Sequence, residues 1–193
     1  MKSFKLRAIL YSVVFYVFTI NSVLAFVPMA MLLEDTTLEE DSTAQHTFAA
    51  SDVTLTINGG VTFGTASGNS QIDTASTNSS IIIDEDALIR GTFNGIKGNN
   101  STGLYISNDG SISTSQTRSI NLLGSTNAEI INNTSGIISS ETGNTIAASS
   151  GTISGATVTN SGLIYATSGT AITFGSTSSG TTLTNNSGAR IYN

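Results

Sequence analysis

The stretch Val158-Thr-Asn-Ser-Gly-Leu-Ile164 belongs to a repeat, because similar stretches recur along the chain. Its glycine is one of six glycine or aspartate anchors separated by 26, 24, 26, 26 and 26 residues: Gly60, Asp86, Gly110, Gly136, Gly162 and Gly188. Five of the six have Asn or Asp two residues earlier, and such residues bond their own backbone in turns. The sequence therefore predicts one unit, with an Asn-x-Gly turn, repeated over most of the chain.

Two apolar positions accompany each turn. The first follows the anchor by two residues in the middle copies, as Leu88, Ile112, Ile138 and Ile164; the outer copies have Thr62 and Arg190 there, with Phe63 and Ile191 one step later. The second is a series with spacings of 24, 24, 26 and 26 residues: Ile72, Ile96, Ile120, Ile146 and Ile172. We expect both series to be buried, and the outer copies to depart from the pattern of the middle ones.

A period near 26 residues is typical of solenoids and propellers. The units are rich in Gly, Ser and Thr and lack a 3.6-residue periodicity, which excludes paired helices. They are also too short for propeller blades, which need roughly 40 to 45 residues. The sequence predicts an all-β chain in which residues 51–193 form a parallel β-helix of about six coils of 24–26 residues. Six coils at the strand spacing give a rod of roughly 29 Å.

The amino-terminal segment has the pattern of a secretory signal peptide. Lys2, Lys5 and Arg7 precede an apolar run over residues 8–18, and Val23-Leu24-Ala25 offers a cleavage site. We interpret residues 1–25 as this signal; an uncleaved membrane anchor is the alternative. Its removal leaves four basic residues against thirteen acidic ones, a formal charge of −9. Such a charge repels phosphate backbones, so we expect no nucleic-acid partner.

Residues 26–50 are predicted to be an acidic leader or an amino-terminal cap. Five of the thirteen acids lie within Glu34–Asp41, without the glycine and ligand spacing of a calcium loop, so we expect no metal there. The single histidine, His46, lies outside the expected repeats, and we expect it to be inert. The absence of cysteine excludes disulfides and thiolate metal sites, so order must come from stacking and hydrogen bonds.

Three runs carry a resemblance to a known family: Ile106-Ser-Asn-Asp-Gly-Ser-Ile112, Ile131-Asn-Asn-Thr-Ser-Gly-Ile-Ile138 and Val158-Thr-Asn-Ser-Gly-Leu-Ile164. Residues 51–193 resemble the pertactin-like passenger domains of autotransporters. The resemblance implies a right-handed β-helix that an outer-membrane β-barrel translocates to the surface of a Gram-negative bacterium. The sequence has no barrel pattern and stops within its sixth expected coil, so we expect an amino-terminal fragment. The resemblance also implies adhesion to molecules of a host or neighbouring cell. A purely structural stalk or spacer is the alternative function.

Polysaccharide degradation and ice binding are two other functions known for rods of this kind. Parallel β-helices include polysaccharide-degrading enzymes, and the only dense acid group of the expected coils is Asp84-Glu85-Asp86. Glycoside hydrolysis needs two carboxyl groups that face each other, whereas these three residues replace an Asn-x-Gly turn. We therefore expect the cluster to form a turn, with Arg90 as a candidate partner for its charge, and we expect no enzymatic activity.

Ice binding would need aligned Thr-x-Thr pairs, and those at residues 54–56, 157–159 and 182–184 are out of phase when counted from their anchors. We therefore expect no cofactor and name no catalytic, metal or binding residue.

Export predicts a defined mature amino terminus. If the chain is produced with its signal in a bacterium, the exported protein should begin at Phe26, since cleavage is expected after Ala25. Edman sequencing or intact mass measures this directly. Exported protein that retains residues 1–25 would favour the membrane-anchor alternative.

Overall fold

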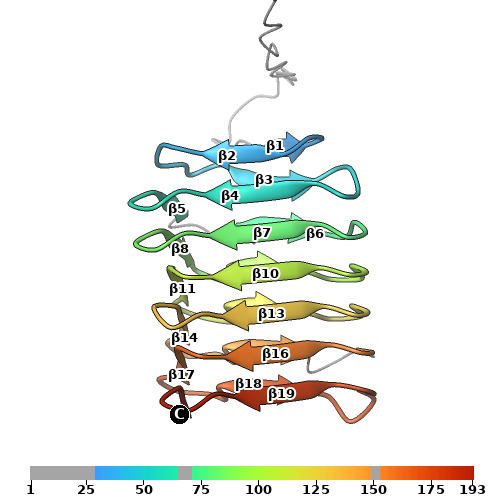
Figure 1. Cartoon of the computed structure of the whole chain (residues 1–193), viewed down its shortest axis with the longest axis vertical. Coiled ribbons are helices and arrows are strands. Elements are labelled where there is room, and N and C mark those ends of the chain that lie inside the picture. The colour runs from blue at the N-terminus through green and yellow to red at the C-terminus, as the bar shows by residue number, and fades with distance from the viewer. Residues whose placement is uncertain (1–28, 65–70, 149–152) are drawn as a thin grey trace, which may run out of the picture.

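The computed structural model describes residues 29–64, 71–148 and 153–193, which fold entirely into short strands, turns and loops without a helix. The signal peptide expected at residues 1–25 lies outside these described residues. Figure 1 shows the strands stacked in successive layers along one axis, with the chain advancing from one end of the stack to the other. The architecture is a parallel β-solenoid, as the repeat predicted.

Three parallel sheets run along the stack. Sheet A contains β1 (Met29–Leu32), β3 (Gln45–Phe48), β6 (Ile72–Thr74), β9 (Ile96–Lys97), β12 (Ile120–Asn121), β15 (Ile146–Ala148) and β18 (Ile172–Phe174). Sheet B contains β2 (Thr36–Leu38), β4 (Thr54–Ile57), β7 (Ser80–Ile83), β10 (Tyr105–Asn108), β13 (Glu129–Asn132), β16 (Thr157–Asn160) and β19 (Thr182–Asn185). Sheet C contains β5 (Thr62–Gly64), β8 (Leu88–Gly91), β11 (Ser111–Thr114), β14 (Ile137–Ser140), β17 (Leu163–Ala166) and β20 (Arg190–Tyr192).

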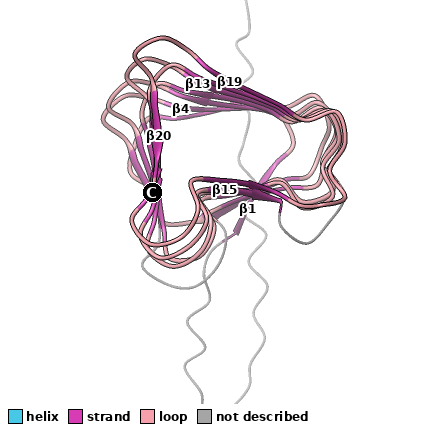
Figure 2. Ribbon diagram, turned by 90° about the horizontal axis from the view of Figure 1, so that it is seen from below, coloured by secondary structure: helices cyan, strands magenta, loops and turns pink. Residues whose placement is uncertain are grey.

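Each full coil contributes one strand to each sheet, and equivalent strands lie almost on top of one another when viewed along the axis (Figure 2). The six expected copies correspond to the six strands of sheet C. The stack begins earlier than residue 51, because β1 pairs with β3 and β2 pairs with β4. Residues 29–50 therefore supply the first strands of the stack. The start of the β-helix expected at residue 51 lies within the stack and not at its edge.

The second isoleucine series is confirmed as a core ladder. Ile72, Ile96, Ile120, Ile146 and Ile172 are consecutive register partners in sheet A. The first four are fully buried, and Ile172 in the last coil is partly buried. Burying an isoleucine contributes roughly 1.5–3 kcal/mol relative to leaving it exposed, so each added coil stabilises the coil before it.

In the first apolar series the outer copies depart as expected, with Phe63 and Ile191 one step later than in the middle copies. The expectation is wrong for β8, where the ladder residue is Ile89 and not Leu88. The buried ladder of sheet C is Phe63, Ile89, Ile112, Ile138, Ile164 and Ile191. Leu88 instead pairs with Ser111 on the outer face and is partly exposed. The six anchors occupy two different turn positions: Gly60, Asp86 and Gly188 have φ of 81°, 66° and 86° and precede the ladder by three residues, while the other anchors precede it by two.

A column of left-handed residues forms the corner at which each coil enters sheet B. Its members are Asp52, Asn78, Gly103, Asn127, Gly155 and Gly180, with φ between 52° and 66°. Glycine, Asn and Asp are the residues that tolerate this conformation. A Cβ added at Gly103 would also lie 2.6 Å from Asn78 Oδ1 of the preceding coil. The corner therefore restricts side chains through both backbone conformation and close stacking.

An asparagine ladder runs inside the solenoid at the end of sheet B. Asn108, Asn132, Asn160 and Asn185 are register partners. Each Nδ2 donates to Oδ1 of the next asparagine at 2.8 Å, so the side-chain amides form a chain of hydrogen bonds along the axis of the rod. The first three are fully buried, whereas Asn185 is exposed in the last coil. Hydrogen bonds along the ladder satisfy polar groups that would be costly to bury alone.

The ladder predicts a position-dependent cost of removing its amides. Asn132→Ala should lower the free energy of unfolding by roughly 2–4 kcal/mol, because Asn108 Nδ2 and Asn160 Oδ1 both lose a buried partner. Asn185→Ala removes the same side chain from the exposed end and should cost less than about 1 kcal/mol. Urea unfolding measures both variants, and equal losses would contradict an internal ladder.

Candidate functional site

The turns that connect sheet B to sheet C differ in length from coil to coil. Four residues connect β13 to β14 and β19 to β20, whereas only Ser161 and Gly162 connect β16 to β17. In the short turn Gly162 lies against the carbonyl oxygens of Asn133 and Gly136 in the preceding coil, where a Cβ would collide. A short turn between two long ones leaves a depression in the side of the rod.

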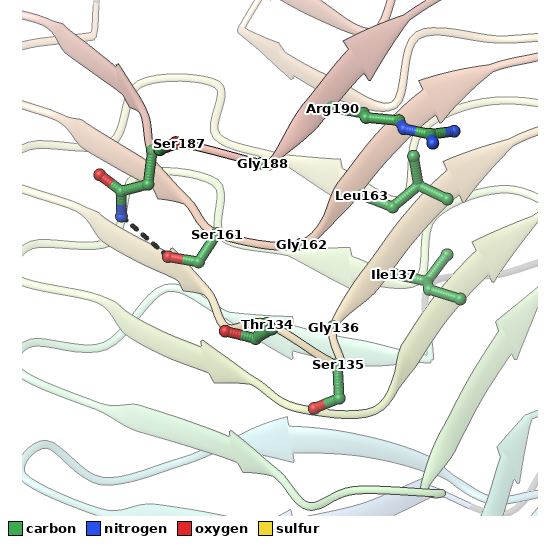
Figure 3. Close-up of a pocket in the computed structure, with 11 residues that line it drawn as sticks. Thr134, Ser135, Gly136, Ile137, Ser161, Gly162, Leu163, Ser187, Gly188 and Arg190 are labelled. Carbon is green, nitrogen blue, oxygen red and sulfur yellow. Dashed lines mark hydrogen bonds between the residues drawn. The ribbon is translucent and has the colours of Figure 1, made fainter.

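This depression is an open groove of about 580 Å³. Its floor is the short turn at Ser161 and Gly162, and its walls are the long turns 133–136 and 186–189 (Figure 3). The walls belong to coils two layers apart, which places their backbones roughly 9.6 Å apart at the usual strand spacing. Pockets for small ligands enclose roughly 300–1,000 Å³, so the volume is sufficient for one.

The groove combines polar and apolar side chains. Its polar members are Thr134, Ser135, Ser161, Asn186 and Ser187. One hydrogen bond joins a wall to the floor, where Asn186 Nδ2 donates to Ser161 Oγ at 2.8 Å. On the side of sheet C, Ile137, Leu163 and Arg190 form a column of register partners, and Figure 3 shows their side chains one above another. The lining includes one base and no acid.

Two tyrosines extend the outer face of sheet C beside this column. Tyr165 and Tyr192 are register partners whose rings stack at 5.5 Å between centroids and 16° between planes. Tyr192 is 47% exposed. Because side chains two residues apart in a strand share a face, Leu163 and Tyr165 both project outward from β17. The end of the rod near β20 therefore carries an aromatic and apolar outer surface beside the groove.

The acid cluster Asp84-Glu85-Asp86 forms a turn, as the sequence predicted. Ala87 N donates to Asp84 O at 3.1 Å, and Asp86 has the left-handed φ of 66°. Glu85 and Asp86 are exposed. Arg90, the candidate partner of the cluster, makes no ion pair among the described residues; the ion pair observed there joins Lys97 Nζ to Asp73 Oδ2 at 2.7 Å. The turn geometry thus accounts for these three acids.

Two carboxylates of the acidic segment cap the amino-terminal edge of the stack. In the following coils the first N–H of a sheet B strand donates to a carbonyl of the preceding coil, as Ser80 N does to Val53 O. In the first full coil, Thr54 N donates instead to Asp35 Oδ1 at 2.8 Å, and Thr62 N at the start of β5 donates to Asp41 Oδ1 at 2.7 Å. The acids replace missing carbonyls, so this segment works as a polar cap.

His46 lies within the stack and not outside it. It pairs with Ile72 in sheet A, exactly one 26-residue period later, which is a spacing that sequence analysis could have used. The ring is 5% exposed, packs edge-on against Phe63 with centroids 4.9 Å apart, and contacts Ala44 O through Nδ1 at 3.1 Å. Burial lowers the pKa of His46, and the bond to Ala44 opposes this only in part.

The Thr-x-Thr pairs are in phase, which corrects the count made from the anchors. Thr157 pairs with Thr182 and Thr159 with Thr184, and Thr54 occupies the same column on β4. The count failed because the anchors are not equivalent positions. The column is nevertheless interrupted, since the three strands between carry Ser80 and Ile82, Tyr105 and Ser107, and Glu129 and Ile131.

Within the described ranges, no group of three or more His, Cys, Asp or Glu side chains could hold a metal ion. No helix long and apolar enough to cross a membrane is found in that part of the chain. Comparison of the chain with protein-family models, curated proteins and solved structures finds no match. The groove at Ser161 and Gly162 and the outer faces of the sheets are the candidate binding surfaces of the described residues.

The cap predicts that acceptor oxygens matter more than charge at the amino-terminal edge. The double variant Asp35→Ala/Asp41→Ala should lower the free energy of unfolding by roughly 1–3 kcal/mol, because two backbone N–H groups lose their acceptors. The matched double Asn variant keeps an oxygen at each site and should recover at least half of the loss. Urea unfolding distinguishes the pairs, and equal losses would exclude capping.

The buried histidine predicts acid sensitivity of the first coils. Because the pKa of His46 is lowered in the folded state, its contribution is complete above the ordinary value of 6.5 and is lost as pH falls below it. Urea unfolding at pH 7 and pH 5 should show a larger loss for the native chain than for His46→Phe, which cannot be protonated. The same loss in both chains would contradict this role for His46.

Proposed function

We propose that this chain is an exported, surface-exposed β-solenoid segment of an autotransporter-like protein, which mediates adhesion to molecules on a host or neighbouring cell. The signal-like amino terminus, the acidic mature chain without cysteine and the resemblance of residues 51–193 support export and display. The outer-membrane barrel implied by the resemblance would carry the rod to the surface of a Gram-negative bacterium. The parallel solenoid is compatible with such a passenger.

One observation carries the adhesive role: outward side chains are held in straight columns along the rod. On sheet B one such column contains Thr54, Ser80, Tyr105, Glu129, Thr157 and Thr182. Neighbouring members are one strand spacing apart, roughly 4.8 Å, over the length of the sheet. A repetitive partner can therefore make several weak contacts at once, and linked contacts raise avidity without any single strong site.

A structural stalk or spacer is the second candidate, and the interior favours it. Continuous isoleucine ladders and the asparagine ladder join successive coils, so the rod is held together along its axis by the same interactions that set its register. Such a rod can hold another domain away from a membrane without binding anything. Both functions need the same stable interior, but only adhesion requires particular side chains on the outer surface.

Display on a non-adherent Gram-negative bacterium separates these roles. The full chain is fused ahead of a translocator barrel, and protease treatment of intact cells checks exposure. We expect attachment to epithelial cells, or to neighbouring bacteria, at several times the level seen with the barrel alone. Antibody staining measures how much rod each strain displays, so that attachment is compared at equal display levels.

The control is a rod with the same core and an altered outer surface. The quadruple variant Thr157→Lys, Thr159→Lys, Thr182→Lys and Thr184→Lys changes outward positions of β16 and β19 and leaves the buried ladders intact. Attachment should fall in this variant while display and protease resistance remain. Displayed native rods that do not attach to either cell type would reject adhesion and leave the spacer role.

A further inference from the structure

The lining of the groove at Ser161 and Gly162 has the chemistry of a sugar site. Pyranose rings present an apolar C–H face and a hydroxyl rim. The groove offers Ile137, which is 36% exposed, and the half-buried Leu163 on one side, and hydroxyl and amide groups from both long turns on the others. Ligand sites generally combine apolar walls with a few placed polar groups, and this groove has both.

Arg190 adds selectivity for a negative charge. Its column position places it above Leu163 at one end of the groove, and its side chain is exposed (Figure 3). In the described part of the chain it makes no ion pair. A guanidinium presents five donors in a planar fork that matches a carboxylate, whereas the surrounding turns supply no competing acid.

The same turn arrangement occurs once more on the rod, with the opposite charge. The short turn Asp109-Gly110 connects β10 to β11 between the four-residue turns 84–87 and 133–136. Here the short turn contains Asp109, and the first long turn contains Asp84, Glu85 and Asp86. The groove at Ser161 and Gly162 is thus lined by an arginine and no acid, in a chain whose formal charge without residues 1–25 is −9. The acids of the equivalent turns around Asp109 would repel an anion.

We propose that the groove formed by turns 133–136, 161–162 and 186–189 binds a carboxylate-bearing sugar, a sialic or uronic acid residue of a cell-surface glycan. The carboxylate pairs with Arg190, the apolar face of the ring packs on Leu163 and Ile137, and the ring hydroxyls bond to side chains of the two long turns. This inference rests on the proposed adhesive function, because it names the chemistry of the molecule that the rod contacts.

Titration of the full mature chain with small sugars tests the inference. The acidic probes are 3′-sialyllactose and digalacturonic acid, and lactose is the neutral control; NMR or isothermal titration calorimetry reports binding. At least one acidic probe should bind with an affinity at least tenfold above that of lactose, and the affinity should fall as salt is raised. If neither acidic probe binds better than lactose, the inference is overturned.

Three variants locate the site. Arg190→Gln should weaken binding of the acidic sugar by tenfold or more, since a charge-assisted hydrogen bond is lost. Leu163→Asp places a negative charge beside Arg190, at an outward and partly exposed position, where it repels the carboxylate of the sugar. This variant should weaken binding at least as much as Arg190→Gln. Arg90→Gln removes another exposed arginine, from the outer face of β8, and should leave binding unchanged. Native-like binding by both groove variants, or an equal loss in Arg90→Gln, would overturn the assignment.

Cell attachment of the same three variants separates this inference from the proposed function. If the native rod attaches to cells while the acidic sugars do not bind to it, the groove assignment fails and adhesion stands. If the sugars bind in the groove but displayed rods do not attach, adhesion fails and the sugar site stands. Loss of both properties in Arg190→Gln, with retention of both in Arg90→Gln, supports the two proposals together.

Discussion

In-register stacking of one coil on the next determines both the core of the rod and the arrangement of its outer surface. Each strand forms main-chain hydrogen bonds with the equivalent strands of adjacent coils, and the side chains at equivalent positions are thereby forced into columns. Inside the rod those columns must be apolar or must pair their polar groups, which explains both the isoleucine ladders and the asparagine ladder. Outside it, the same constraint distributes polar side chains in lines along the surface.

Two places in the stack show what happens when a column lacks an equivalent partner. At the amino-terminal edge, Asp35 and Asp41 supply side-chain oxygens where a preceding coil would have supplied carbonyls. Asn108 Oδ1 is buried without a partner among the described residues, because the preceding coil carries Ile83 at that position. Each case follows from a column that ends.

The repeat was readable from the sequence because stacking requires periodic isoleucines, and the ladder from Ile72 to Ile172 was predicted residue by residue. Turn structure was less predictable, because the Asn of an Asn-x-Gly sequence occupies two different structural positions in this chain. Asn58 begins a turn, whereas Asn108 is a buried ladder residue, and their spacing to a glycine is the same. The groove was missed for this reason: its shape comes from a turn two residues shorter than its neighbours, which only the correct register reveals. Counting residues between the ends of sheet B strands and the Ile112–Ile138–Ile164 ladder would have found it.

Cysteine cross-linking between adjacent coils tests the register most directly, since the native chain has no cysteine. Leu88 and Ser111 are register partners on the outer face of sheet C, so their Cα atoms should lie within the roughly 4.4–6.8 Å range that a disulfide spans. Leu88 and Ser113 share that face but are two residues out of register, beyond this range. Oxidation of the Leu88→Cys/Ser111→Cys chain should lower its mass by 2 Da in mass spectrometry without unfolding it, and Leu88→Cys/Ser113→Cys should remain reduced. Efficient cross-linking of the second pair, or failure of the first, would contradict the stacked register from which the core, the turns and the groove are derived.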